Sequence, residues 1–199
     1  PFKKLVHVGL INAEDGRKMS KRWGNVVNPD DVVGEFGADA MRLYEMFMGP
    51  FSQSVAWSMS GVSGIRRFLE KVWKLQTMIN EEGTTNNKIQ ILIHKTIKKV
   101  TEDIENFRFN TAISQLMILV NAMEKEKTLL ITDYCSLLTV LSPFAPHIAE
   151  EIWQEKLGHK ESIFKEKWPV ADEKYLKDEE VEMVVQINGK LRDRIFVAP

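Results

Sequence analysis

The sequence has almost no cysteine, little net charge and no long apolar run, and each absence excludes a class of protein. Cys135 is the only cysteine, so neither an internal disulfide nor a multi-cysteine zinc site can form, as is typical of the cytoplasm. No stretch approaches the roughly 18 consecutive apolar residues of a membrane-spanning helix, and no signal-peptide segment opens the chain. We therefore expect a cytoplasmic protein with no membrane partner and no bound metal framework.

Charge is unevenly distributed, although the net charge is only −1. Residues 1–24 contain six basic residues against two acidic ones, and residues 66–100 contain eight against three. The remaining segments have an acidic excess. A polyanion partner would therefore have to bind at these two basic segments, because the chain as a whole does not attract it.

The first 58 residues predict a strand, a loop and two short helices. Leu5 to Ile11 is an apolar run with β-branched residues, and residues 17–25 have neither helical nor strand periodicity. Asn28 followed by Pro29 is a helix-start signal, and a second helix is expected over Ala38 to Phe47.

The central part of the chain has the apolar periodicity of a helical bundle. Apolar residues recur at helical spacing, and Asn110 is placed to cap one helix. Short loops between the helices favour antiparallel packing. The expected helical segments are residues 62–79, 89–104, 112–123, 129–141 and 145–157.

The character of the sequence changes after Gly158. Two β-rich runs flank Asn188-Gly189, which is a strong signal for a hairpin with a type I′ turn. The fold class we expect is mainly α: an antiparallel helical bundle, preceded by a strand–loop–helix tail and followed by a β-hairpin. The expected divisions are 1–58, 59–160, and 161–199 as a linker and the start of an α/β domain.

The segment richest in potential chemistry is the loop from Gly16 to Asn25. It contains three basic residues within five consecutive positions: Lys18, Lys21 and Arg22. A basic loop is most often a solvated turn, but ammonium groups on a mobile backbone can follow a phosphate chain whose charge moves during a reaction.

The specific string favours the second interpretation. Lys18-Met19-Ser20-Lys21-Arg22 resembles the K-M-S-K-S signature of class I aminoacyl-tRNA synthetases, and Gly37 to Leu43 resembles their G-A-D-x-x-R block. Further segments resemble the leucine branch of that class. They are Arg42–Pro50, Phe109–Ile113, Ser142–Trp153 and Gln186–Asp193.

The resemblance implies activation of leucine with ATP and Mg²⁺, followed by transfer of the leucyl group to tRNA(Leu). Lys18 and Lys21 would be the catalytic residues, with Lys21 neutralising the departing pyrophosphate. The sequence departs from the signature at Arg22, which is usually serine or threonine, and at Trp23. The implied nucleotide-binding residues are Lys18, Met19, Ser20, Lys21, Arg22 and Gly24.

The family also implies tRNA contacts on the helical bundle and on the hairpin. A charged helix face is usually only solvated, so phosphate contact and solvation remain comparable alternatives at these positions. The candidate tRNA-binding residues are Arg66, Arg67, Lys71, Lys74, Lys95, Lys98, Lys190 and Arg192.

The second class I signature, of the H-x-G-H type, is absent. We therefore expect a monomeric C-terminal piece of a synthetase that is inactive by itself, and a ligase only as part of a longer chain. Two alternatives stay open: a free-standing RNA-binding or adaptor module derived from a synthetase, and a piece of the valine, isoleucine or methionine enzymes. An upstream histidine signature, or amino-acid-dependent pyrophosphate exchange, would discriminate between them.

Overall fold

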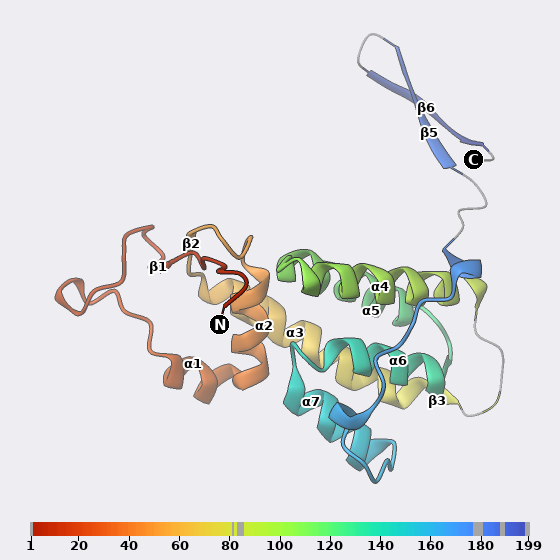
Figure 1. The fold of residues 1–199 in the computed structure, drawn as a ribbon, viewed down its shortest axis with the longest axis horizontal. Coiled ribbons are helices and arrows are strands. Elements are labelled where there is room, and N and C mark those ends of the chain that lie inside the picture. The colour runs from red at the N-terminus through yellow and green to blue at the C-terminus, as the bar shows by residue number, and fades with distance from the viewer. Residues whose placement is uncertain (1, 81, 83–85, 177–180, 188–189, 198–199) are drawn as a thin grey trace.

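The computed structural model describes residues 2–80, 82, 86–176, 181–187 and 190–197 (Figure 1). In the tail, β1 (Ile11–Asn12) pairs in parallel with β2 (Val55–Ala56). The predicted strand over Leu5 to Ile11 is wrong except at Ile11. In the described part of the chain β1 pairs only with β2, and because β2 is two residues long the pairing does not extend back to Leu5. Leu5 and Val8 are consequently exposed.

The two short helices that follow are confirmed. α1 (Pro29–Phe36) begins with Pro29 at its first position, and the Asn28 side chain accepts a hydrogen bond from the Asp30 N–H at 3.2 Å. Gly37, at φ +91°, ends α1 and immediately precedes α2 (Ala38–Phe47). A left-handed φ of this kind is easy only for glycine, so the sharp turn between the helices depends on it.

The bundle contains the predicted helices with altered ends. The 3-10 turn Gln76–Met78 follows the first helix, and a π-helical turn, Ile152–Lys156, continues the last. The helices are α3 (Met59–Leu75), α4 (Asn87–Glu105), α5 (Phe109–Met123), α6 (Ile131–Leu141) and α7 (Pro146–Glu151).

The core lies between these helices. α5 packs against α2, α3 and α4, so one buried cluster joins the tail to the bundle. Its largest fully buried side chains include Tyr134, whose hydroxyl donates to the Val72 carbonyl at 2.7 Å, and Phe144. Burial raises the pKa of Tyr134 well above its ordinary value, which keeps the phenol neutral.

Two boundaries differ from expectation. Leu129–Leu130 form strand β4 instead of a helical turn, because they pair in parallel with β3 (Ile79–Asn80). Asn110 does not cap α5, which begins one residue earlier with Arg108 at the cap position. The corner between α4 and α5 is therefore shorter than predicted. It is formed by Phe107, which adopts a φ of +57°, and by the Arg108 N–H, which donates to the Asp103 carbonyl at 2.8 Å.

Residues 161–176, here called the strap, pass from α7, where the Ile163 N–H donates to Glu150 at 3.0 Å, to α4. Their 3-10 turns are Ile163–Lys165 and Glu173–Tyr175. The Trp168 indole donates to the Thr101 hydroxyl at 2.8 Å, and the Asp172 N–H donates to His94 Nδ1 at 3.1 Å.

The C-terminal hairpin is confirmed as an antiparallel pair, β5 (Val181–Ile187) and β6 (Lys190–Val197), with a register shift between Val185 and Gln186. Figure 1 shows it standing apart from the helices. Asn188-Gly189 lies outside the described residues, so the type I′ turn stays a prediction. No helix in the described part of the chain is long and apolar enough to cross a membrane.

Candidate functional site

Local contacts shape the loop of residues 16–25, here called the signature loop. Gly16 at φ +78° turns the chain back, so that the Ala13 N–H donates to the Arg17 carbonyl at 2.8 Å. Sequence reasoning expected no regular structure here, yet Lys21–Trp23 form a 3-10 turn. The Ser20 hydroxyl caps this turn by accepting from the Arg22 N–H at 3.3 Å, and Gly24 ends it at φ +62°.

Asn25 clamps the two sides of the loop together. Its side-chain oxygen accepts from the Ser20 N–H at 2.8 Å, and its amide nitrogen donates to the Lys18 carbonyl at 3.4 Å. The sequence places Asn25 at the end of this loop and did not predict a role for it. An asparagine that follows a glycine at a turn is a signal for such a side-chain-to-backbone bond.

The catalytic candidates Lys18 and Lys21 lie exposed on this braced loop. Within the described residues neither ammonium group is in an ion pair. Arg22 is placed differently, because its guanidinium carbon lies 5.5 Å from the Trp23 ring. Two unpaired ammonium groups and a guanidinium on one short loop form a suitable surface for a polyphosphate.

A second cation lies over the Trp23 ring. The Arg17 guanidinium carbon lies 5.3 Å from the ring, and Arg17 is itself paired with Asp15 at 2.6 Å. The side-chain hydrogen bonds from Arg17 lower the pKa of Asp15. Met19, in contrast, packs against the core and anchors the loop to the tail.

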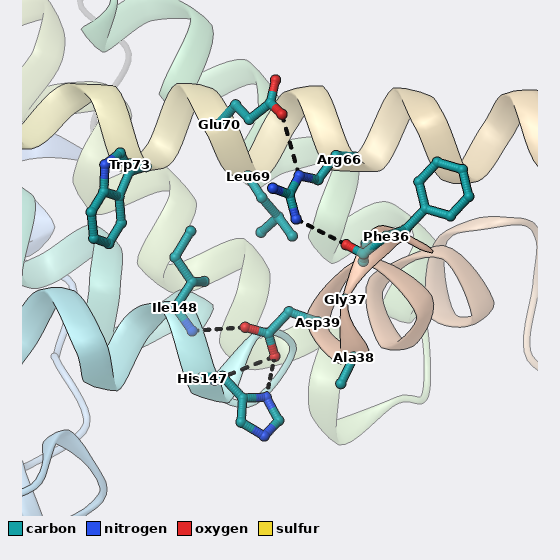
Figure 2. A pocket seen from close by; sticks show the side chains of 11 residues that line it. Phe36, Gly37, Ala38, Asp39, Arg66, Leu69, Glu70, Trp73, His147 and Ile148 are labelled. Atoms are coloured by element: carbon teal, nitrogen blue, oxygen red, sulfur yellow. Dashed lines mark hydrogen bonds and ion pairs between the residues drawn. The ribbon is translucent and has the colours of Figure 1, made fainter. Parts of the chain in front are cut away.

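The G-A-D-x-x-R block joins the tail to the bundle (Figure 2). The Asp39 carboxylate accepts from the N–H groups of His147 and Ile148, at 3.3 and 2.7 Å, and lies 2.8 Å from His147 Nδ1. Arg42 donates to the Pro143 carbonyl at 3.1 Å. The helices that follow the signature loop are thus fixed to the corner between α6 and α7.

A groove of about 620 Å³ lies beside this junction. Arg66, one of the candidate tRNA-binding residues, lines it and donates to the Phe36 carbonyl at the end of α1, at 3.0 Å, and to Glu70 at 3.2 Å (Figure 2). Arg66 therefore has two partners within the molecule, and its bond to Phe36 closes the end of α1.

The other candidate tRNA-binding residues of the bundle lie on two helices, α3 and α4. Lys71 is held by α5, through Asn121 and Glu124, each at 2.7 Å. On α3, Arg67 and Lys74 are exposed; on α4, Lys98 is exposed and Lys95 is half-buried. α5 packs against both α3 and α4, so the basic residues belong to two helices that share this neighbour.

The hairpin candidates are only partly described. Arg192 is exposed on β6, and the side chain of Lys190 lies outside the described part of the structure. The tRNA-binding assignments on the bundle and hairpin therefore stay predictions.

The remaining reactive side chains have structural roles. Cys135 Sγ lies 3.8 Å from His159 Nε2, and burial raises the pKa of this thiol to about 11, which leaves little thiolate for nucleophilic chemistry. His159 stacks on Trp153 with ring centroids 3.8 Å apart. In the described ranges, no group of three or more His, Cys, Asp or Glu side chains could hold a metal ion.

Known proteins resemble both parts of the chain. Residues 1–58 match the family described as tRNA synthetases class I (I, L, M and V), and residues 86–199 match the anticodon-binding domain of tRNA ligases. A solved structure of the leucyl-tRNA synthetase of Agrobacterium radiobacter K84, in a ternary complex with tRNA and LeuAMS, is 34% identical with a TM-score of 0.83. The similarity covers all of this chain and 28% of that one. The chain belongs to the class I aminoacyl-tRNA synthetases and contains the anticodon-binding domain of these ligases.

Proposed function

We propose that the chain supplies the ATP-facing loop and the tRNA-contacting helices of a leucine–tRNA ligase. The observation that carries this proposal is the braced signature loop, which presents Lys18 and Lys21 without ion pairs among the described residues. The similarity to a leucyl-tRNA synthetase over the whole chain supports leucine as the amino acid.

The loop's contribution to the reaction would be electrostatic. Leucine activation releases pyrophosphate from ATP, so negative charge accumulates on the leaving phosphates. Lys21 and Lys18 would stabilise that charge, and Arg22 would add a guanidinium donor next to them. Gly24 leaves open space where a side chain would meet the nucleotide.

Mg²⁺ would accompany the phosphate chain of ATP. Asp15 directly precedes the signature loop, and its carboxylate is paired with Arg17. Phosphate oxygens are the usual ligands of Mg²⁺ in nucleotide sites, and the ion neutralises part of their charge.

The test is binding of tripolyphosphate to the chain by calorimetry. Lys18→Ala and Lys21→Ala should each weaken binding about tenfold, because a charge-assisted contact contributes about 1.5 kcal/mol. Lys160→Ala is the matched control, since Lys160 is an exposed lysine beyond the bundle. Equal affinity in all four proteins would contradict the proposal.

Amino-acid specificity is tested in a polypeptide that also contains the histidine signature. Leucine should support pyrophosphate exchange where valine, isoleucine and methionine do not. Lys21→Ala should lower the exchange rate about a hundredfold, with little change in leucine binding. The chain of 199 residues should give no exchange by itself.

A further inference from the structure

The corner between α4 and α5 has an unusual backbone. Phe107 is the single non-glycine residue with a positive φ in the described part of the chain, and left-handed backbone is unfavourable for a bulky side chain. The corner is held by Asp103, whose carboxylate accepts from Arg108 Nε at 2.7 Å and from the Thr111 hydroxyl at 2.6 Å. Strained residues of this kind persist only where the surroundings fix them, and they concentrate at functional sites.

The strained conformation leaves an aromatic ring partly in solvent. The side chain of Phe107 is 37% exposed. Phe144, which is connected to it through Phe109 in a cluster of aromatic contacts, is only 1% exposed. Phe51 and Phe109 already contact each other at 5.6 Å between ring centroids, and Phe109 contacts Phe144 at 6.4 Å. Phe107 itself contacts Phe51 and Phe109, with ring centroids 5.5 and 5.7 Å apart, so it belongs to this aromatic cluster and still leaves part of its ring in solvent.

A cavity of about 230 Å³ opens beside this ring, between the tail and the corner. Two aromatic rings line it, Phe51 and Phe107, and none of its lining residues is acidic. Ser52 and Asn110 also line it, and their side chains make no hydrogen bond within the described residues.

Positive charge lies at the edge of the cavity. Arg108 lines it and retains guanidinium donors beyond the Nε–H that binds Asp103. The Lys4 ammonium lies 6.0 Å from the centre of the Phe107 ring. An aromatic face, free amide and hydroxyl groups, and two cations form a combination that matches a nucleotide: the base stacks, its edge is hydrogen-bonded, and its phosphate is neutralised.

We propose that this cavity binds one unpaired nucleotide of an RNA held by the bundle, with its base stacked on Phe107. The proposal rests on the proposed tRNA-binding function and adds a site at the C-terminal end of α4. The sequence did not reveal it, because nothing in Asn106-Phe107-Arg108 indicates a left-handed backbone.

Phe107→Gly tests the site directly. Glycine adopts a positive φ without penalty, so this change removes the ring and relieves the strained backbone. Phe164→Gly, at another exposed aromatic residue outside the cavity, is the control. Binding is measured by fluorescence anisotropy with two probes: deacylated tRNA(Leu), which has unpaired nucleotides, and a blunt RNA duplex of twelve base pairs, which has none.

Phe107→Gly should weaken tRNA binding about tenfold and leave duplex binding unchanged, since stacking on one aromatic residue contributes on that order. Asn110→Ala, which keeps the ring and the corner, should weaken tRNA binding about fivefold. Unchanged tRNA affinity in both variants would overturn the site while leaving the proposed function intact. Failure of the unmodified chain to bind either RNA would overturn the proposed function itself.

Discussion

At the scale of single residues, Asp103 is a buried carboxylate of the bundle with three side-chain partners. It is fully buried and accepts from Lys99, Arg108 and Thr111. Removal from water raises the pKa of Asp103, but the hydrogen bonds from these three side chains outweigh that effect and hold the pKa below its ordinary value. The carboxylate is thus stabilised in its charged form.

Asp103→Asn should lower the free energy of unfolding by about 2 kcal/mol, because it removes the charge that pairs with Lys99 and Arg108 and leaves a buried amide with poor partners. Urea unfolding of the two proteins measures the difference, and Glu102→Gln, an exposed neighbour, is the control. Because the pKa of Asp103 is lowered by folding, its contribution is present above pH 4 and is lost as the pH falls below it. Equal stabilities of wild type and Asp103→Asn at pH 7 would contradict this role.

At the scale of elements, the strap is attached to α4 through a histidine that must be neutral. His94 Nδ1 accepts the Asp172 N–H, and the ring stacks on Tyr175 with centroids 4.6 Å apart. Burial lowers the pKa of His94, opposed by the charge of Asp172 and assisted by that of Lys174. A protonated Nδ1 has no lone pair for the Asp172 N–H, so protonation detaches this end of the strap.

The sign of the pH dependence follows from the lowered pKa. Below the ordinary histidine value, about 6.5, the unfolded chain binds a proton that the folded chain resists, so this contact loses stability as the pH falls. As the pH falls from 7.5 to 5.5, the protection factor of the Asp172 amide, which compares its hydrogen exchange with the rate of an unstructured amide at the same pH, should therefore decrease. His94→Gln should remove the pH dependence at this amide, and an identical pH profile in the variant would show that another group is responsible.

At the scale of the whole molecule, the charge available to a polyanion comes from several exposed basic residues at once. Arg67, Lys74 and Lys98 are exposed on two helices and have no ion pair in the described structure. We expect tRNA affinity to fall steeply with salt, and each substitution of these residues by alanine to reduce the slope of log K against log salt by about one. Arg66→Ala and Lys71→Ala should change the slope less, because both residues already have partners inside the protein. A salt-independent affinity would contradict phosphate binding by the bundle.

Sequence patterns predicted the helices well, because their signals are local. The apolar spacing on α3 and α4 and the Asn28-Pro29 start of α1 depend on neighbouring residues alone, and the structure confirms them. The predictions of a strand over Leu5 to Ile11 and of a cap at Asn110 were wrong because both features depend on contacts beyond neighbouring residues. A strand needs a partner from elsewhere in the chain, and the start of α5 depends on the left-handed turn at Phe107.

The sequence by itself determined the helical bundle, the hairpin pairing and the family resemblance of the signature loop, because periodicity, turn residues and motif strings are properties of adjacent positions. The tertiary structure decided which charges are free. Arg66 and Lys71 look like Arg67 and Lys74 in the sequence, yet the first two bind Phe36 and Glu124 across the fold. It also brought Lys4 and Phe51 beside Phe107, since only the packing of tail against bundle places residues so distant in the chain around one cavity.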